Sequence, residues 1–324
     1  MGWYSAVGRR AFFALPPEVA HRVAGKMLSL PLPWARIGGA STGRPVAVTL
    51  AGIPLLNPVG LAAGFDKTGA HVEALGALGF GYIVAGTFTL EPRRGNRHPR
   101  IARFPRQRSM VNAMGLPNPG AEVAAATLAN RNLAVPVFAS IADQSRDAAL
   151  ATLKLLSPHT DAIELNASCP NVEWGRDRND EAHLAELVTA LAARAERPLF
   201  VKLPPFVTDS GREGVLALAR VAQDSGATGI TCSNTHPVLT DRVASGKGGL
   251  SGRALWPHTP KIVAAIVEAT GGALPVNACG GIFTPGDARE CLDAGATTVQ
   301  IYTSFIYEGP GIVGTLTRGL RAPV

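Results

Sequence analysis

The feature that most constrains the fold is a pattern that occurs eight times along the chain: a short apolar run, then a stretch with helical periodicity. The apolar runs cover residues 59–63, 81–86, 135–141, 162–167, 198–203, 229–234, 275–280 and 298–303. The predicted helices lie near 69–78, 120–131, 145–157, 180–195, 211–225, 257–270, 286–294 and 310–320. Strands that are apolar throughout are typical of parallel sheets covered by helices. We therefore predict an α/β protein with a (β/α)8 TIM barrel.

A doubly wound open sheet is the alternative for this pattern. That fold often carries a GxGxxG motif after its first strand, and no such motif follows residues 59–63. The length of 324 residues suits one barrel, and 46% hydrophobic with 17% charged residues is typical of a globular protein. The closed barrel is therefore the favoured fold.

The first forty residues do not follow the barrel pattern. Aromatic and aliphatic residues interleave with Arg9 and Arg10, and a second helical stretch runs from about residue 18 to 30. The residues concerned in the first stretch are Trp3, Tyr4, Val7, Phe12, Phe13 and Leu15. Two amphipathic helices of this kind suit a membrane interface. A helical cap on the barrel is the alternative, and a signal peptide is disfavoured because the two arginines interrupt its apolar core.

We therefore predict two parts. Residues 1–40 form an N-terminal helical extension that associates with a membrane, and residues 41–324 form the barrel. No run of 18 apolar residues is present, so no segment is predicted to span a bilayer.

The net charge of +7 favours anionic ligands or surfaces. Much of it comes from an arginine cluster: Arg93, Arg94, Arg97, Arg100, Arg103, Arg106 and Arg108. A solvated basic loop is the plainer interpretation, and no nucleic-acid-binding signature accompanies the cluster. The four cysteines show no CxxC spacing, so no metal site is expected.

Barrel enzymes carry their chemistry at the C-terminal ends of the strands. Here these ends are rich in Lys, Asn, Ser, Thr and Gly, whereas the strand bodies are not. They read Gly64-Phe65-Asp66-Lys67, Gly86-Thr87, Ser140, Asn166 to Asn171, Lys202, Ser233-Asn234-Thr235, Gly280-Gly281 and Tyr302-Thr303-Ser304. This rim is the predicted active site.

Glycine-rich segments follow the last three strands, including residues 248–252. Barrels commonly bind phosphate there through loop amides and a helix N-terminus. A phosphate-bearing cofactor is therefore predicted. The chain has no GxxxxGK[ST] motif, which disfavours a nucleoside triphosphate.

Cys169 lies on the predicted loop after the fourth strand, where its thiolate would serve as a base or nucleophile. Cys232 and Cys279 lie inside strands and are interpreted as inert core thiols. Lys67 and Lys202 end two strands. Either would suit a Schiff base in an aldolase-type barrel, or one would neutralise a substrate carboxylate and the other an electron-rich cofactor ring.

Several long segments occur in a characteristic order. They are residues 57–67, 95–100, 112–118, 166–171 and 201–203, followed by the last three glycine and Tyr302-Thr303 segments. In these segments the chain resembles the dihydroorotate dehydrogenases, over nearly its whole length. The resemblance implies oxidation of dihydroorotate to orotate, a CH–CH oxidoreductase reaction of de novo pyrimidine biosynthesis.

The resemblance also implies FMN across the barrel mouth and a substrate beside it. The FMN-binding residues would be Ala62, Ala63, Gly64, Thr87, Ser140, Asn166, Lys202, Ser233, Gly249, Ser251, Gly252, Gly280, Gly281, Tyr302 and Thr303. The substrate-binding residues would be Lys67, Asn112, Met114, Gly115, Leu116, Asn166, Asn171, Asn234 and Thr235. Cys169 would remove a proton from the substrate while a hydride leaves for the flavin.

Features of two classes of this family are mixed. The N-terminal helices resemble the membrane-associated, quinone-using class, in which His21 and Arg103 would line the quinone tunnel. Cys169, Ser140 and residues 114–118 resemble the soluble, fumarate-using class. Residues 172–176 match neither.

Quinone is the expected acceptor, because a soluble enzyme has no need of the helical pair. The alternatives are fumarate as acceptor, a paralogue acting on another dihydropyrimidine or enone-like substrate, and a flavin-binding interaction or sensor module. We expect a cytoplasmic protein held peripherally on the inner face of the cell membrane through residues 1–34, because the helices there carry apolar residues. No nucleic acid and no required protein partner are expected.

Overall fold

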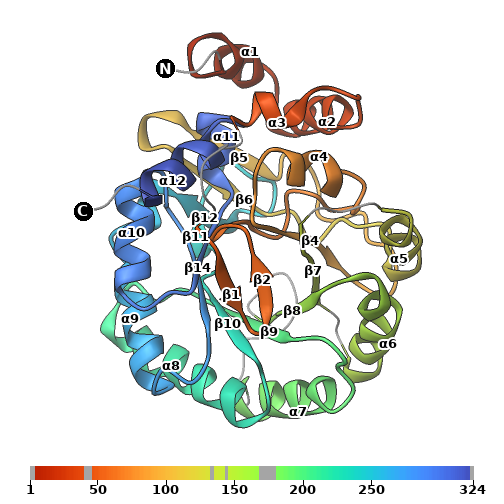
Figure 1. Cartoon of the computed structure of the whole chain (residues 1–324), viewed down its shortest axis with the longest axis vertical. Helices are drawn as coiled ribbons and strands as arrows, with labels where there is room; N and C mark the ends of the chain where they lie inside the picture. The colour runs from red at the N-terminus through yellow and green to blue at the C-terminus, as the bar shows by residue number, and fades with distance from the viewer. Residues whose placement is uncertain (1–3, 40–45, 132–134, 143–144, 168–179, 322–324) are drawn as a thin grey trace.

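The computed structural model describes residues 4–39, 46–131, 135–142, 145–167 and 180–321. Eight parallel strands form a closed barrel (Figure 1). In chain order they are β3 (Val59–Leu61), β4 (Tyr82–Phe88), β7 (Val137–Ile141), β8 (Ala162–Asn166), β9 (Leu199–Leu203), β10 (Gly229–Cys232), β13 (Val276–Cys279) and β14 (Thr298–Ile301). Each strand overlaps one of the eight predicted runs. The TIM barrel is confirmed, and the open sheet is excluded because β14 pairs with β3.

Helices surround the barrel on its outside (Figure 1). They are α4 (Val72–Ala77), α5 (Ala121–Ala129), α6 (Arg146–Leu156), α7 (Asp180–Ala192), α8 (Asp209–Asp224), α9 (Thr259–Ala269), α10 (Pro285–Asp293) and α12 (Ile312–Arg321). Helix α8 begins two residues before its predicted start because the Thr208 hydroxyl caps it, accepting from the Gly211 amide. A short helix, α11 (Thr303–Glu308), follows β14 directly and was not predicted.

An antiparallel hairpin of β1 (Val48–Leu50) and β2 (Ile53–Leu55) covers one end of the barrel (Figure 1). Its leucines pack with Tyr82, Phe138 and Phe200, which lie at or next to the first residues of their strands. The three rings follow one another at centroid distances of 4.9 and 5.4 Å. The hairpin therefore closes the N-terminal end of the barrel and leaves the C-terminal end for a ligand.

A second sheet borders the C-terminal end. It contains β5 (Ile101–Phe104), β6 (Ser109–Asn112), β11 (His236–Leu239) and β12 (Lys247–Gly252), in the antiparallel order β11-β12-β6-β5. Two of its strands come from the segment after β4 and two from the segment after β10. The sequence interpretation missed this sheet, whose central pair, β12 and β6, joins segments separated by more than a hundred residues.

The predicted N-terminal helices are present outside the ring of barrel helices, at the top of Figure 1. After a π-helical turn (Tyr4–Gly8) come α1 (Arg9–Ala14), α2 (Pro17–Leu28) and α3 (Trp34–Ile37). Within the described part of the chain, no helix is long and apolar enough to cross a bilayer.

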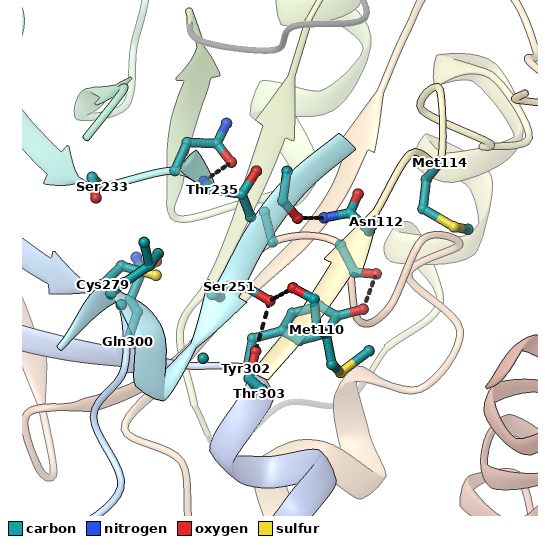
Figure 2. Close-up of a pocket in the computed structure, with 18 of the residues that line it drawn as sticks. Met110, Asn112, Met114, Ser233, Thr235, Ser251, Cys279, Gln300, Tyr302 and Thr303 are labelled. Carbon is teal, nitrogen blue, oxygen red and sulfur yellow. Dashed lines mark hydrogen bonds between the residues drawn. The ribbon is translucent and has the colours of Figure 1, made fainter. Parts of the chain in front are cut away.

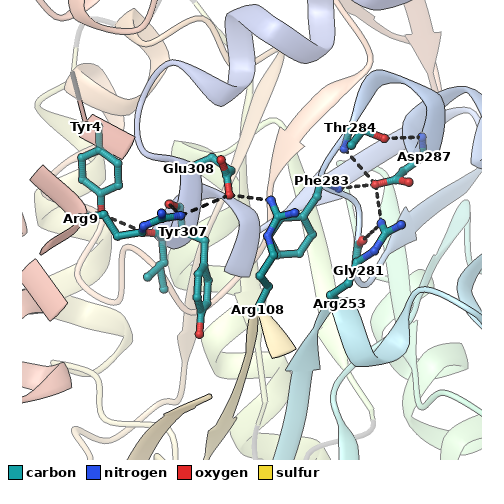
Figure 3. A network of polar contacts seen from close by, with 11 residues as sticks. Tyr4, Arg9, Arg108, Arg253, Gly281, Phe283, Thr284, Asp287, Tyr307 and Glu308 are labelled. Carbon is teal, nitrogen blue, oxygen red and sulfur yellow. Dashed lines mark hydrogen bonds and ion pairs between the residues drawn. The ribbon is translucent and has the colours of Figure 1, made fainter. Parts of the chain in front are cut away.

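Polar contacts fasten these helices to the barrel. Glu18 on α2 forms an ion pair with Arg100 at 3.0 Å, and Arg103 donates to the carbonyls of Phe12 and Leu15. Figure 3 shows a third contact, in which Glu308 lies between Arg9 at 4.0 Å and Arg108 at 2.6 Å. The helices are thus attached along the loop and sheet that border the barrel mouth.

We expect Leu50→Ala to lower the free energy of unfolding by about 2 to 5 kcal/mol, because it leaves a cavity next to the three aromatic rings at the closed end of the barrel. Leu50 has an exposed fraction of 0%. Urea unfolding followed by circular dichroism measures the change. The control is Leu56→Ala just after the same hairpin, at 58% exposure, which should change stability by less than about 0.5 kcal/mol. Equal losses of stability in both variants would contradict the packing of the hairpin on the N-terminal end of the barrel.

Candidate active site

The C-terminal ends of barrel strands surround a cavity, and Figure 2 draws 18 of its lining residues. The predicted site residues that line it are Ala62, Ala63, Gly64, Lys67, Thr87, Asn112, Met114, Gly115, Leu116, Asn166, Lys202, Ser233, Asn234, Thr235, Gly249, Ser251, Gly252, Gly280, Gly281, Tyr302 and Thr303. Cys169 and Asn171 lie outside the described residues. The structure therefore brings together residues from the first strand of the barrel to the last.

Ser140 is placed differently from the other predicted residues. It is fully buried and does not line the cavity. Its hydroxyl lies 3.0 Å from that of Thr87, which does line the cavity. Ser140 therefore supports a lining residue.

Several lining residues were missed. They are Ile101, Met110, Pro117, Leu255, Cys279, Ile282, Gln300 and Ile301. Ser304, predicted as part of the rim, also lines the cavity. The interpretation of Cys279 as a core thiol was wrong. Cys279 is the last residue of β13, is half-buried and lines the cavity. Burial nevertheless raises the pKa of its thiol. Ile101 and Met110 belong to the second sheet and carried no local signal, since that sheet was not predicted.

Lys67 lies just after β3 on a loop that Asp66 organises. The Asp66 carboxylate accepts hydrogen bonds from the backbone amides of Gly69 and His71, at 2.9 and 2.8 Å. The Lys67 ammonium donates to the Gly64 carbonyl at 2.5 Å. Burial lowers the pKa of Lys67 to about 8, although the negative charges of Asp66 and Glu18 act to raise it. Near neutral pH, Lys67 therefore remains a cation in the cavity wall.

Side-chain amides form a connected row in the wall of the same cavity. The Asn234 amide donates to Asn166 at 3.0 Å, and the Asn166 amide donates to the Thr87 hydroxyl at 3.3 Å. In the second sheet, Asn112 on β6 donates to the Gly249 carbonyl at 3.4 Å. Asparagines fixed in this way present donors and acceptors that suit a planar ring with amide edges.

The corner formed by β12, β13 and α11 fits a phosphate. Gly252 and Gly281 have φ of 89° and 70°, and a Cβ atom at Gly281 would lie 2.7 Å from the Trp256 nitrogen. Ser304 lines the cavity, and its hydroxyl is buried without a hydrogen-bond partner among the described residues. Buried hydroxyls normally have partners, so a ligand oxygen is the expected one. Arg253, in the same corner, forms an ion pair with Asp287 at 2.6 Å and donates a hydrogen bond to the Gly281 carbonyl, as Figure 3 shows.

A second, apolar cavity of about 320 Å³ lies between the N-terminal helices and the barrel. Its lining is mainly aromatic and aliphatic, and it includes His21 and Arg103, the two predicted tunnel residues. Burial lowers the pKa of His21 to about 3, and the Lys67 charge adds to this effect, so its imidazole is neutral near pH 7. Arg103 lies 4.5 Å from the centre of the Phe13 ring.

The two cavities share a wall. Ile101, Met110 and Tyr302 line both of them. Tyr302 also donates to the Gly64 carbonyl at 3.3 Å, next to Lys67. A polar, phosphate-fitting cavity and an apolar cavity are therefore separated by single side chains.

The family model described as dihydroorotate dehydrogenase matches residues 45–323. This chain belongs to the dihydroorotate dehydrogenase family. A protein of Erythrobacter litoralis named dihydroorotate dehydrogenase (quinone) is 39% identical, with 96% of this chain and 93% of the relative covered. A protein of the same name from Chloroflexus aurantiacus is also 39% identical, with 84% and 81% covered.

Solved structures agree with this family assignment. The crystal structure of DHODH from Eimeria tenella in complex with ferulenol superposes with a TM-score of 0.82 at 28% identity. The superposition covers 94% of this chain and 90% of the other. The ligand-free DHODH of the same organism gives a TM-score of 0.81, covering 94% of both chains. The similarity thus includes almost all of the fold described above.

Proposed function

We propose that this protein oxidises dihydroorotate to orotate in pyrimidine biosynthesis and passes the electrons to a quinone. The observation that carries the proposal is the shared wall, which separates a polar cavity beside Lys67 from an apolar cavity beside His21. The first suits a cyclic diamide with a carboxylate, and the second suits a quinone. The relatives reported above are named for this reaction, and none of them supports fumarate, another substrate or a sensor role.

FMN is the cofactor in this proposal. Gly252, Gly281 and Ser304 would hold its phosphate, because that corner combines close backbone approach with an unpaired hydroxyl. Thr87 and Lys202 would border its ring. When bound, FMN supplies a hydride acceptor, and the protein supplies position and electrostatics.

Lys67 would bind the substrate carboxylate, and Asn112, Asn166 and Asn234 would hold the amide edges of the ring. Cys169 would accept the proton from the carbon next to the carbonyl, while the hydride of the neighbouring carbon leaves for the flavin. Loss of one proton and one hydride from adjacent carbons is a two-electron oxidation and forms the C=C bond of orotate. The remaining predicted contacts, Asn171 and Thr235, would complete the substrate pocket.

The N-terminal helices would attach the protein peripherally to the inner face of the cell membrane. Val7, Val23, Leu30 and Leu32 are exposed apolar residues on or next to these helices. Exposed basic residues on the same helices are Arg10, Arg22, Lys26 and Arg36. Apolar and basic side chains together favour an anionic bilayer surface. Quinone would then enter the apolar cavity from the membrane.

The direct test is to mix the purified, flavin-loaded protein anaerobically with dihydroorotate and record absorbance near ~450 nm, where oxidised flavin absorbs. We expect rapid bleaching. Cys169→Ala should slow it by ~10²–10⁴-fold, the usual contribution of a general base. Cys291→Ala, which changes a buried cysteine of α10, is the matched control and should bleach at the wild-type rate. A flavin-loaded protein that does not bleach would refute the proposed substrate.

Orotate binding should weaken as the pH rises through about 8, because the pKa of Lys67 is lowered to that value and only its protonated form attracts the carboxylate. Below pH 8 the dissociation constant should be constant, and above it the constant should increase by up to ~tenfold per pH unit, as for one linked proton. Calorimetric titration measures it. Lys67→Met should bind weakly at every pH, whereas Lys26→Met on α2 should retain the wild-type profile.

Ala24→Trp should block the apolar cavity, which Ala24 lines from α2. We expect flavin reduction by dihydroorotate to be unchanged and reoxidation by a short-chain quinone to slow at least ~tenfold, as overpacking closes the space. Stopped-flow measurements separate the two half-reactions. Val23→Trp, on the exposed side of the same helix, should affect neither in solution. Unimpaired reoxidation in Ala24→Trp would place the quinone elsewhere.

A further inference from the structure

The barrel interior below the candidate active site holds a continuous row of buried polar side chains. In order they are Tyr82, Thr298, Asn277, Thr231, Glu164 and Lys202, contributed by six different strands. Exposed fractions are 0% for Glu164 and 5% for Lys202. Barrel interiors are usually filled by branched apolar residues, and a buried ion pair is costly to desolvate. This row therefore calls for a functional explanation.

The hydrogen bonds of the row point in one direction. The Thr298 hydroxyl donates to the Asn277 carbonyl oxygen at 2.6 Å, so the Tyr82 hydroxyl, 2.7 Å away, is the donor to Thr298. The Asn277 amide donates to Thr231 at 3.2 Å, and Thr231 donates to Glu164 Oε2 at 2.8 Å. Donors aligned in this way stabilise negative charge at the end of the row. The row therefore favours Glu164 as a carboxylate.

Lys202 lies between that carboxylate and the cavity. Its Nζ atom is 3.7 Å from Glu164 Oε1, and its side chain lines the cavity. Burial alone would lower the pKa of Lys202, but Glu164 on β8, with a smaller effect of Cys279 on β13, raises it. Among the described residues, these are the titratable groups that act on Lys202. Since burial raises the pKa of the Cys279 thiol, that group is neutral near pH 7 and Glu164 is the compensating charge.

We propose that Glu164 is a positioning residue that keeps Lys202 protonated in both redox states of the enzyme, so that reducing the bound cofactor takes up no proton at Lys202. This inference rests on the proposed function, in which Lys202 borders FMN. As a consequence, the reduction potential of the bound flavin would vary with pH only through the proton that the flavin itself takes up. Without Glu164, Lys202 would lose its proton in the oxidised protein and regain it when negative charge appears on the ring.

The first test is the reduction potential of bound FMN in Glu164→Gln, measured by equilibration with reference dyes from pH 6 to 9. Each proton coupled to a two-electron reduction adds about 30 mV per pH unit, because one pH unit is a tenfold change in proton activity. We expect about 30 mV per pH unit in the wild type, for one proton. In Glu164→Gln we expect a slope approaching about 60 mV per pH unit, for two. An unchanged slope overturns the proposal.

Thr231→Val is the matched control. It removes the hydroxyl that donates to Glu164 and disturbs the same row, but it retains both charges. We expect the wild-type slope. A slope as steep as that of Glu164→Gln would mean that any disturbance of the row has this effect, and would overturn the role of the carboxylate. If Glu164→Gln does not fold, Glu164→Asp is measured instead, and its weaker pairing should give an intermediate slope.

A second measurement does not need the cofactor. In flavin-free protein with ¹³C-labelled lysine, the Lys202 signal is identified by its loss in Lys202→Arg, and its titration is followed by NMR. We expect Lys202 to titrate at clearly lower pH in Glu164→Gln than in the wild type. An unchanged titration overturns the proposal.

The two measurements separate the possible failures. A lowered Lys202 titration with an unchanged potential slope would mean that Glu164 controls Lys202 but that Lys202 does not border the flavin. That result refutes the cofactor placement in the proposed function and, with it, the redox part of this inference. A protein that binds no FMN refutes the proposed function alone, while the NMR titration still decides the role of Glu164.

Discussion

The structure depends on the pairing of β14 with β3, which closes eight parallel strands into a barrel. Because all eight strands run in the same direction, their C-terminal ends meet at one rim. Lys67 and Lys202 are separated by 135 positions in the sequence, and both line the cavity at that rim. The hairpin packed on Phe138 and Phe200 seals the opposite end. Closure thus both gathers the polar residues and leaves a single open end of the barrel for them to face.

The two buried lysines of the rim meet the cost of burial in different ways. Lys202 has a carboxylate partner inside the barrel, and its pKa is raised. Lys67 has a backbone carbonyl as its nearest acceptor, and burial lowers its pKa to about 8. A lysine without a carboxylate in contact remains available to an anionic ligand, whereas a paired lysine is a fixed charge. One rim therefore contains a lysine paired with a carboxylate and a lysine whose contact is a backbone carbonyl.

The N-terminal helices add a second environment to this rim. The Glu18–Arg100 ion pair and the Arg103 contacts hold α1 and α2 against the sheet that borders the mouth. Between the helices and the barrel they leave an apolar cavity, whose boundary with the polar one consists of side chains such as Tyr302 and Met110. A polar substrate would bind poorly in an apolar cavity, and an apolar acceptor would bind poorly in a polar one. Electron transfer between two such ligands therefore needs two different cavities close together.

The sequence by itself determined the barrel, the positions of its strands and the N-terminal helical pair, because apolar runs and helical periodicity are local properties. It also identified most of the cavity lining, since strand ends such as Lys67, Asn166 and Lys202 are recognisable by their polarity. Only the tertiary structure revealed the second sheet, the shared wall and the placement of Ser140 behind Thr87. The pairing of Glu164 with Lys202 was equally hidden, because Glu164 lies within an apolar run and its partner is on the neighbouring strand. Contacts between strands depend on register and closure, and no local pattern encodes them.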